Sequence, residues 1–527
     1  MIRTQWTSAC NPMRSLIQEC EHSLRVDIPS TTADHFYYRT DGECIEVTDD
    51  LRRLVRPSDT LDGRAIYSIL QFGTAIPPLS PWKEIRRIVP GRTTTFRDHP
   101  VRIEEAGHPK GRGWDQELRS IERSQQISIV LDTLDHALLA ARQKRPLIIL
   151  FSGGIDSGLL AARAAALGLE DTLLVNYSFD PDDAESLLAE QMAKHLGLSL
   201  HRIRDDGTGA DAEGVLAHAG RDYRNPFCDS STVPTGKLVQ SVIGRYGSEY
   251  AVVDGTGADG AFGLFDWSRQ WRKVHSLPCS TLRIAAHAYQ TFQLWQQNSR
   301  LEYWLRVLRR ASQHRFPLSA IAQNPLAGIA YAAPKHISLE VESMAISWLR
   351  SISPDDPLLQ LTAVDLALAC CGVVTQKSQS LFAAAEIDVV YPYLSPEMAW
   401  IALSSASWQR EDREEKWLLK AALARHVPVQ MVYRPKSGFA APMSQMFQSE
   451  GFRAAFHNLC SGQSPLSPFL EKSFLHTIGE KIASDSVLPT QTTNLVWAIV
   501  FVSEWLDQVA GAGTMEARGM VVCSEGG

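Results

Sequence analysis

The chain has 527 residues, of which 44% are hydrophobic, so it can bury a large core and is expected to form about two to four domains. Its formal net charge of -7 excludes the overall basic surface that favours binding to a phosphate backbone, and nucleic acid is therefore not an expected partner. The nine cysteines include no Cys-x-x-Cys pair and no zinc-ligand spacing, which is typical of reduced thiols.

Neither end of the chain predicts a membrane segment. The sequence after Met1 lacks the apolar stretch of a signal peptide, and the longest apolar run near the C-terminus, residues 495–502, is too short to span a bilayer. We therefore expect a soluble cytoplasmic protein without membrane contacts.

The first hundred residues predict a small β-rich domain. Residues 35–47 form a predicted strand, turn and strand, because Asp41 and Gly42 supply the positive φ values of a tight hairpin. Two further strands are predicted at residues 93–96 and 101–103, with a turn between them.

A polar, turn-rich stretch at residues 111–114 indicates a boundary between two domains. An irregular helical pattern of leucine and isoleucine residues follows it at residues 118–138. We therefore assign residues 1–115 to the β-rich domain and residues 116–527 to a second domain.

After Pro146 the chain alternates between strands and helices, a pattern typical of a parallel sheet with crossover helices. From about residue 280 it is predicted to be mostly helical. The predicted fold class is therefore α/β, with a Rossmann-like parallel sheet, many helices and the small β-rich N-terminal domain. The strands of the sheet are predicted at residues 147–151, 172–178, 199–203 and 250–254, and the intervening helices at residues 158–167 and 184–196.

Residues 152–157, with the sequence Ser-Gly-Gly-Ile-Asp-Ser, follow the first of these strands and open the next helix. The two glycines let the main chain approach an anion, and the free N–H groups of the helix start point toward it. Asp156 adds a hard oxygen suited to Mg2+, and the hydroxyls of Ser152 and Ser157 add donors. The loop therefore predicts a phosphate site for a nucleotide, and the alternative is a tight turn without a ligand.

This loop differs from the two common nucleotide-binding loops. It lacks the Gly-Lys-Ser/Thr of the P-loop, and its glycine spacing is not that of the dinucleotide fingerprint. It resembles the pyrophosphatase-type loop (PP-loop) of enzymes that cleave ATP between the α and β phosphates. That resemblance alone leaves asparagine synthetases, argininosuccinate synthetases, NAD and GMP synthetases and tRNA-modifying enzymes open.

Five further segments, in matching order and separation, resemble the asparagine synthetase domain. The resemblance extends from about residue 60 to the C-terminal helices, and it implies an ATP-dependent ligase that forms amides through an adenylate and releases AMP and pyrophosphate. The segments are residues 225–231 (Asn-Pro-Phe-Cys-Asp-Ser-Ser), 254–259 (Asp-Gly-Thr-Gly-Ala-Asp), 390–394 (Val-Tyr-Pro-Tyr-Leu), 416–420 (Lys-Trp-Leu-Leu-Lys) and 434–439 (Arg-Pro-Lys-Ser-Gly-Phe).

These segments contribute the other candidate site residues. Asp259 follows a glycine-rich turn after a strand, so it can face Asp156 across the strand ends, where two carboxylates would hold Mg2+ on the ATP phosphates. The alternative is that Asp259 caps a helix N-terminus. The remaining candidates for ATP binding are Gly153, Gly154, Ser178, Gly255 and Arg434, the last of which could equally form a surface ion pair.

Lys436 lies in a loop bounded by proline and glycine, where it can donate a hydrogen bond to the departing pyrophosphate or to an oxyanion. The resemblance implies a catalytic role for it, because the matching lysine of the β-lactam synthetase branch is catalytic. The alternative is a solvated surface charge.

The chain departs from glutamine-dependent asparagine synthetases at two key positions. Those enzymes need a cysteine after the initiating methionine as glutaminase nucleophile, and this chain has Ile2 there. At the third position of residues 254–259 they carry a glutamate, and β-lactam synthetases carry a tyrosine that acts as base, but this chain has Thr256, a poor base. The attacking nitrogen is therefore expected to be partly deprotonated already, as in a peptide α-amine with a pKa of about 8. Acidic residues usual in the family are also replaced at Asn225, Gly260 and Ser395, and the catalytic candidates are Thr256, Asp259 and Lys436.

A truncated N-terminal domain without glutaminase activity, joined to a complete synthetase domain, is similar to the lasso peptide cyclases. This resemblance implies an Ntn-hydrolase-like fold for residues 1–115. It also implies that a side-chain carboxylate of a precursor peptide is adenylated, and that the peptide's own N-terminal amine then closes an isopeptide macrolactam. The implied cofactors are ATP and Mg2+, and the implied partners are the precursor peptide, a leader-peptide-binding protein and a transglutaminase-like protease.

Two other interpretations stay open. One is a ligase that resembles β-lactam synthetase or forms asparagine without using glutamine, against which the replacement at Thr256 argues. The other is a degenerate nucleotide-binding scaffold that partners another enzyme, against which the intact loop, Asp259 and Lys436 argue.

Overall fold

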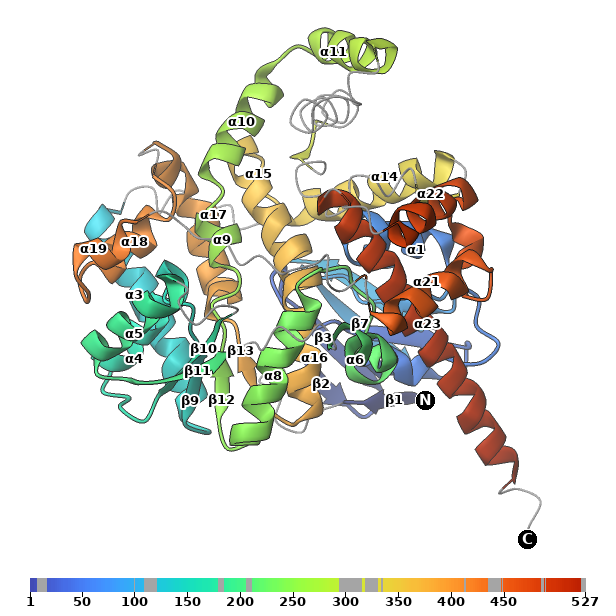
Figure 1. The fold of residues 1–527 in the computed structure, drawn as a ribbon, viewed down its shortest axis with the longest axis horizontal. Helices are drawn as coiled ribbons and strands as arrows, with labels where there is room; N and C mark the ends of the chain where they lie inside the picture. The colour runs from blue at the N-terminus through green and yellow to red at the C-terminus, as the bar shows by residue number, and fades with distance from the viewer. Residues whose placement is uncertain are drawn as a thin grey trace.

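The computed structural model shows a β-rich N-terminal part beside a larger α/β part, which continues into a helical C-terminal region (Figure 1). The predicted boundary near residue 115 lies outside the described residues, so the division into domains stays a prediction. The structure describes residues 1–6, 17–98, 100–108, 121–178, 184–204, 211–292, 315–317, 330–332, 335–411, 414–434, 447, 449–484, 488 and 490–522.

Two four-stranded sheets form the N-terminal part, with the strand orders β1-β5-β4-β6 and β2-β3-β7-β8. The antiparallel pairs β4–β5 and β7–β8 confirm the two predicted hairpins. Tyr38 and Phe96, one from each sheet, pack edge to face in a small core with ring centroids 5.2 Å apart. The strands are β1 (Ile2–Gln5), β2 (Ile17–Cys20), β3 (Ser23–Ile28), β4 (Tyr37–Thr40), β5 (Ile45–Thr48), β6 (Ile85–Arg87), β7 (Arg92–Asp98) and β8 (Val101–Gly107).

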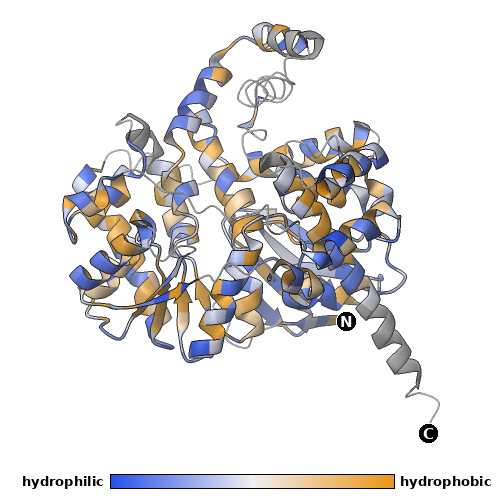
Figure 2. Ribbon diagram, viewed as in Figure 1, coloured by the Kyte–Doolittle hydropathy of each residue, from blue (hydrophilic) through white to orange (hydrophobic). Residues whose placement is uncertain are grey.

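A parallel sheet of order β11-β10-β9-β12-β13 organises the α/β part and confirms the predicted fold class. Its central strands are short aliphatic runs, coloured orange in Figure 2, and their side chains are buried on both faces of the sheet. The strands are β9 (Leu147–Leu150), β10 (Leu173–Ser178), β11 (Ser199–Arg204), β12 (Ala251–Val253) and β13 (Val389–Val390).

The strand order creates a switch point between β9 and β12. From β9 the chain builds the sheet outward to β10 and β11, and then returns to the other side of β9 to add β12 and β13. Parallel sheets bind their ligands at the carboxyl ends of the strands beside such a point, because the loops there diverge. The two glycine-rich segments, residues 152–157 and 254–259, both follow these two strands.

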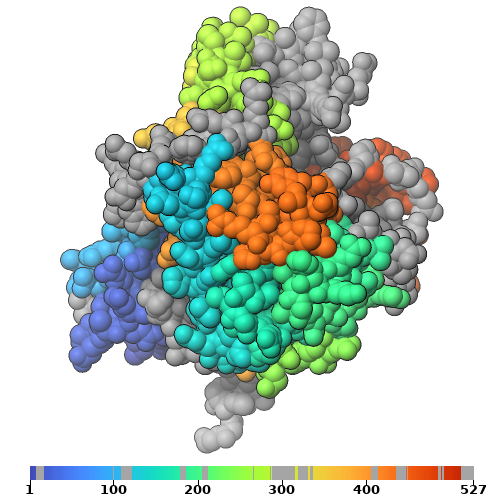
Figure 3. Space-filling model, turned by 90° about the vertical axis from the view of Figure 1, so that its left-hand side faces the viewer, coloured from blue at the N-terminus to red at the C-terminus, as the bar shows by residue number. Residues whose placement is uncertain are grey.

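The predicted helices of the α/β part are confirmed, with one shift. Helix α4 begins at Ile155 rather than at Gly158, because the end of the glycine-rich loop already forms its first turn. Strand β13 was not predicted, because two residues give no alternation to recognise. Helix α18 packs against α3 and α4, and Figure 3 shows it in orange beside the cyan and green of these helices.

The helices vary widely in length, and most of the longer ones follow β12. They are α1 (Gly63–Phe72), α3 (Arg123–Arg142), α4 (Ile155–Ala166), α5 (Ala184–Leu196), α6 (Asp211–Ala217), α7 (Ala219–Asp222), α8 (Thr232–Tyr246), α9 (Ala258–Phe262), α10 (Phe265–Ser276), α11 (Cys279–Phe292), α14 (Lys335–Ile352), α15 (Pro357–Val364), the π-helical segment η5 (Asp365–Val374), α16 (Gln376–Ala384), α17 (Pro396–Glu411), α18 (Trp417–Leu423), α19 (Val429–Val432), α21 (Glu450–Cys460), α22 (Lys472–Ala483) and α23 (Thr490–Val522).

The N-terminal part and the last helix share one hydrophobic core. Trp497, Phe501 and Trp505 form an apolar stripe on α23, and all three are fully buried. The ring of Trp505 packs on that of Trp82, which precedes β6, at 5.7 Å between centroids. The first and last segments of the chain therefore stabilise each other directly.

One stretch, Pro357–Val374, is long and apolar enough to cross a membrane by composition alone, but 78% of it is buried inside the protein. Burial on this scale is what a core helix shows, and the stretch packs with α10 and α17.

Candidate active site

The glycine-rich loops after β9 and β12 touch at the carboxyl edge of the sheet. A Cβ atom built on Gly255 would lie 3.5 Å from the main-chain nitrogen of Ser157, so the loops are in van der Waals contact. The hydroxyl of Tyr393, which follows β13, donates to the carbonyl oxygen of Asp156 at 2.9 Å. The segments that follow three neighbouring strands therefore meet at this edge of the sheet.

The phosphate loop requires its first glycine and leaves its helix start open. Gly153 has φ +74°, and a Cβ atom there would lie 2.9 Å from the Cα of Ala189 in α5. Gly154 is the N-cap of α4 and offers no side chain, so the first N–H groups of that helix can receive an anion. The hydroxyl oxygen of Ser152 accepts from Gly154 N at 3.2 Å, and that of Ser157 accepts from Ser152 N at 3.1 Å, which fixes the loop.

Asp156 and Asp259 face each other, as predicted, but a lysine ammonium lies between them. The Nζ of Lys416 donates to both carboxylate oxygens of Asp156, at 2.8 and 2.6 Å, and lies 2.8 Å from Oδ1 of Asp259. Lys416 is only 8% exposed. Burial alone would lower the pKa of this ammonium, but the two carboxylates raise it above its ordinary value. It is therefore a charged group at the point where the two acids meet.

The backbone holds Lys416 in this position. It has φ +56°, a left-handed conformation that is unfavourable for lysine, directly before the first residue of α18. Its N–H donates to the carbonyl oxygen of Phe262, at the end of α9, at 2.8 Å. Along the sequence, Lys416 belongs to one of the segments that resemble the asparagine synthetase domain, and that membership is the only sequence signal that marks it.

The structure describes some of the other predicted site residues and not others. Arg434 reaches the loop, because its Nη2 donates to the carbonyl oxygen of Gly153 at 3.2 Å. Ser178 ends β10 and is 2% exposed. Lys436 lies outside the described residues, so its catalytic role stays a prediction.

Thr256 is engaged with the carboxylate that precedes it. Both its main-chain N–H and its hydroxyl donate to Oδ1 of Asp254 at 2.8 Å. Burial raises the pKa of Asp254 above its ordinary value, against the hydrogen bonds from Thr256 and the charge of Lys377. The hydroxyl is thus a hydrogen-bond donor here, which agrees with its expected weakness as a base.

A second lysine, Lys377, lies close enough to Asp254 for its charge to lower the pKa of that carboxyl, against the larger effect of burial. The Nζ of Lys377, on α16, donates to Oδ2 of Asp229 at 3.0 Å and to the hydroxyl of Ser231 at 2.6 Å. Although Asp229 is buried, Lys377 and Ser231 hold the pKa of its carboxyl below the ordinary value. Asp229 belongs to one of the segments that resemble the asparagine synthetase domain, but Lys377 belongs to none of them and was not predicted as a site residue.

A model of the asparagine synthase family matches residues 130–507, which include the phosphate loop, both acids and Lys416. The chain belongs to the asparagine synthase family. Membership makes it an ATP-dependent ligase that forms carbon–nitrogen bonds of the amide type. No curated protein gives a significant match to the chain.

Two of the family's replaced acids have a structural explanation. The hydroxyl oxygen of Ser395 accepts from Met398 N at 3.2 Å at the start of α17, a capping role that serine and aspartate fill about equally. A Cβ atom at Gly260 would collide with Oδ2 of Asp365, which comes from η5. Burial, with a smaller contribution from Asp259, raises the pKa of Asp365 to about 6. A carboxylate from another segment thus occupies the space of the missing side chain.

An acidic side chain introduced at position 260 is therefore expected to destabilise this protein. Gly260→Glu would force a side chain against Asp365 and the Sγ of Cys370 and place a second carboxylate beside a buried one, costing about 1–3 kcal/mol from overpacking alone. The free energy of unfolding from urea denaturation measures the effect. Gly244→Ala in α8, where a Cβ meets nothing within 4 Å, is the control and should be neutral or stabilising. Equal stability of the two variants would contradict the replacement of the missing acid by Asp365.

Proposed function

We propose that this enzyme adenylates a side-chain carboxylate of a peptide and joins it to the peptide's own N-terminal amine, which closes a lasso-type macrolactam. The observation that carries the proposal is the convergence of Asp156, Asp259 and Lys416 beside the open start of α4. Such a site suits the triphosphate of ATP. The replacement of the usual base by Thr256 favours an amine that is already partly neutral.

In the first step, a carboxylate oxygen of the peptide attacks the α-phosphorus of ATP. The bond from that phosphorus to the bridging oxygen breaks, and pyrophosphate leaves with the electron pair. The N–H groups at the start of α4, the ammonium of Lys416 and the guanidinium of Arg434 would stabilise the negative charge on the leaving group. Arg434 already reaches the loop through its bond to Gly153.

Asp156 and Asp259 are the residues that would hold Mg2+. The ion is typically bound by one or two carboxylates together with substrate phosphates and water, and two carboxylates converge here. Within the described ranges, no three His, Cys, Asp or Glu side chains form a metal site by themselves, so the ion would arrive with ATP. When bound, it would neutralise phosphate charge.

In the second step, the N-terminal amine attacks the acyl carbon, AMP leaves, and the nitrogen loses a proton. A peptide α-amine has a pKa of about 8, so an appreciable fraction is neutral near physiological pH. Thr256 donates its hydroxyl hydrogen to Asp254 and is not arranged to take that proton. Catalysis of ring closure would then come mainly from holding the amine and the adenylate together.

The same proposal extends to the partners and the compartment. Besides the precursor peptide, a leader-peptide-binding protein would deliver the substrate and a transglutaminase-like protease would free its N-terminal amine. Since ATP is the cosubstrate and the described cysteines are free thiols, we place the reaction in the cytoplasm.

Pyrophosphate release with three substrate sets tests this function. The purified enzyme, with ATP and Mg2+, is given a lasso-type precursor peptide with a free N-terminus, free aspartate with ammonia, or no carboxylate. We expect release only with the peptide, together with a product lighter than the linear peptide by one water. Tandem mass spectrometry then locates the isopeptide bond at the N-terminus.

Each other result counts against the proposal in a defined way. Release with aspartate and ammonia would favour asparagine formation. A peptide product joined between two chains would show ligation without ring closure. Absence of release with every carboxylate would favour a nucleotide-binding scaffold.

A further inference from the structure

A cavity of about 480 Å3 lies between the N-terminal part and the edge of the parallel sheet. Residues 29 and 31–34 of the N-terminal part form one wall, and α3 contributes Ala137 and Ala141. Ala383 of α16 lines it as well. The volume is within the range of about 300–1,000 Å3 that is typical of ligand pockets, and small residues on both helices keep it open.

The edge strand of the sheet runs along this cavity. Five consecutive residues, 387–391, all line it, and they include the whole of β13. β13 pairs with β12, and within the described part of the chain no strand pairs with its other side. The cavity therefore runs along an open sheet edge that is two residues, or about 7 Å, long at about 3.3 Å per residue.

The register shows which main-chain groups face the cavity. The N–H groups of Val252 and Asp254, in and after β12, donate to the carbonyl oxygens of Asp388 and Val390. Because alternate residues of a parallel strand bond to opposite neighbours, the N–H and C=O of Val389 point away from β12. They point toward the cavity side and are available to an added strand.

One wall of the cavity packs against the loop that carries Thr256. Tyr391 and Leu394, which line it, follow β13 toward the carboxyl edge of the sheet. The side chain of Leu394 lies against Gly257, inside the loop that carries Thr256. Tyr391 is close enough to Asp254 for that carboxylate to raise the pKa of its phenol, after the larger effect of burial. A chain that lies on β13 would therefore run toward the carboxyl edge of the sheet, where this loop lies, separated from it by Tyr391 and Leu394.

The charged groups of the cavity are already paired, which argues against an ionic ligand. Lys144 and Asp388 form an ion pair at 3.6 Å, and Gln379 donates to Asp34. Arg224 bonds to Asp49 of the N-terminal part at 3.2 Å, and its main-chain N–H donates to Ser380 at 3.4 Å. What the cavity offers is apolar surface and strand-edge hydrogen bonds, the combination that binds an extended peptide.

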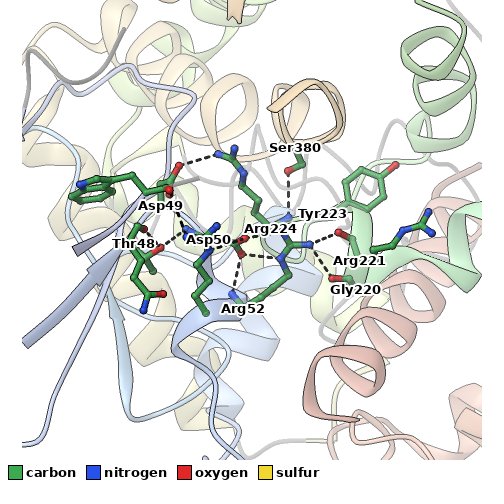
Figure 4. Close-up of polar contacts among 12 residues, drawn as sticks. Thr48, Asp49, Asp50, Arg52, Gly220, Arg221, Tyr223, Arg224 and Ser380 are labelled. Carbon is green, nitrogen blue, oxygen red and sulfur yellow. Dashed lines mark hydrogen bonds and ion pairs between the residues drawn. The ribbon is translucent and has the colours of Figure 1, made fainter. Parts of the chain in front are cut away.

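Polar contacts near the cavity join the N-terminal part to the α/β part. Figure 4 shows Arg224 reaching Asp49 at the end of β5, and Arg52 reaching the main chain of α7, where its Nη1 donates to the carbonyl oxygen of Gly220 at 3.1 Å. The Asp49–Arg224 pair is almost completely buried. These contacts tie the N-terminal part, which forms one wall of the cavity, to the α/β part that forms the rest.

We propose that an extended segment of the peptide substrate binds in this cavity as an additional strand on β13, with the N-terminal part as its outer wall. The proposal rests on the peptide ligase function proposed above and assigns a role to the N-terminal part that does not require glutamine. Main-chain hydrogen bonds to Val389 would fix the register of the peptide. The small residues of α3 and α16 would restrict its side chains.

The test fills the cavity and compares Michaelis constants. Ala137→Phe and Ala383→Phe each place a large ring in the cavity. Ala384→Phe is the matched control, because it places the same ring on the exposed neighbouring position of α16. For the peptide that supports pyrophosphate release by the wild-type enzyme, both filled variants should raise KM at least about tenfold, leave KM for ATP within about twofold, and retain the wild-type melting temperature. The control should change neither constant.

A substrate scan makes the test independent of folding. Single N-methyl groups along the peptide main chain remove one N–H at a time, and binding as a strand predicts that KM rises at alternate positions only. An unchanged peptide KM in both filled variants, or N-methyl effects without alternation, would overturn the proposal while leaving the ligase function intact. Absence of peptide-dependent release in the wild type would instead refute the function itself.

Discussion

Asp156→Asn and Asp259→Asn are each expected to lower the rate of pyrophosphate release by at least about 100-fold. Asparagine keeps the shape of the side chain but removes the charge that faces Lys416 and that would hold Mg2+ on the phosphates. Loss of one preorganised electrostatic contact to a transition state costs about 10²–10³ in kcat. Initial rates at saturating ATP, measured over a Mg2+ titration, separate a lower maximal rate from weaker metal binding.

A matched control lies at the amino ends of the strands of the same sheet, away from the candidate site. Asp171 precedes β10 and pairs on the surface with Arg142 at 2.6 Å, so Asp171→Asn should keep wild-type turnover. Near-wild-type turnover of both Asp156→Asn and Asp259→Asn would remove the proposed active site. Chelation of Mg2+ should reduce release by the wild-type enzyme to the level of these variants.

Lys416→Met is expected to lower both the turnover and the stability of the enzyme. Mg2+ is expected to restore part of the lost stability. Methionine has a similar length but no charge, so the carboxylates of Asp156 and Asp259 would repel each other without a cation between them. Removal of one member of a buried ion pair costs about 3–5 kcal/mol, and the exposure of Asp259 places this case at the low end. Turnover should fall about 10²-fold through the lost stabilisation of pyrophosphate.

Thermal unfolding with and without Mg2+ checks this prediction. A divalent cation can occupy the position of the missing ammonium, so Mg2+ should raise the melting temperature of Lys416→Met more than that of the wild type. Lys420→Met, one turn later on α18, removes only a partly exposed pair with Glu414 and should change the free energy of unfolding by about 0–1 kcal/mol. Equal responses of the two variants to Mg2+ would contradict the placement of Lys416 at a cation site.

The Lys416 bridge also bears on how ATP would enter. One ammonium pairs with two acids that would otherwise repel each other, so the three side chains are already held together before any metal binds. If Mg2+ and the triphosphate bind here as proposed, the carboxylates and the ammonium would each gain a partner of opposite charge. The same three side chains would then serve both the folded enzyme and the bound nucleotide.

The amino-acid sequence by itself determined the local features of this protein. The aliphatic run at residues 147–150, two glycines and an alanine-rich helix specify a strand, a phosphate loop and a helix, because each depends on neighbours along the chain. The alternation of strands and helices likewise predicted the parallel sheet. The facing positions of Asp156 and Asp259 followed from the rule that parallel strands meet at their carboxyl ends.

Only the tertiary structure decided which distant groups share the candidate active site. No local sequence pattern predicts that the side chain of Lys416 is buried. Its place between two acids depends on the packing of α18 against α3 and α4. Asp365 fills the space at Gly260 because η5 packs beside α9. The open edge of β13 could not be predicted from the sequence, because a strand of two residues gives no alternating pattern. Such contacts join segments far apart in the chain, and no local periodicity encodes the geometry that brings them together.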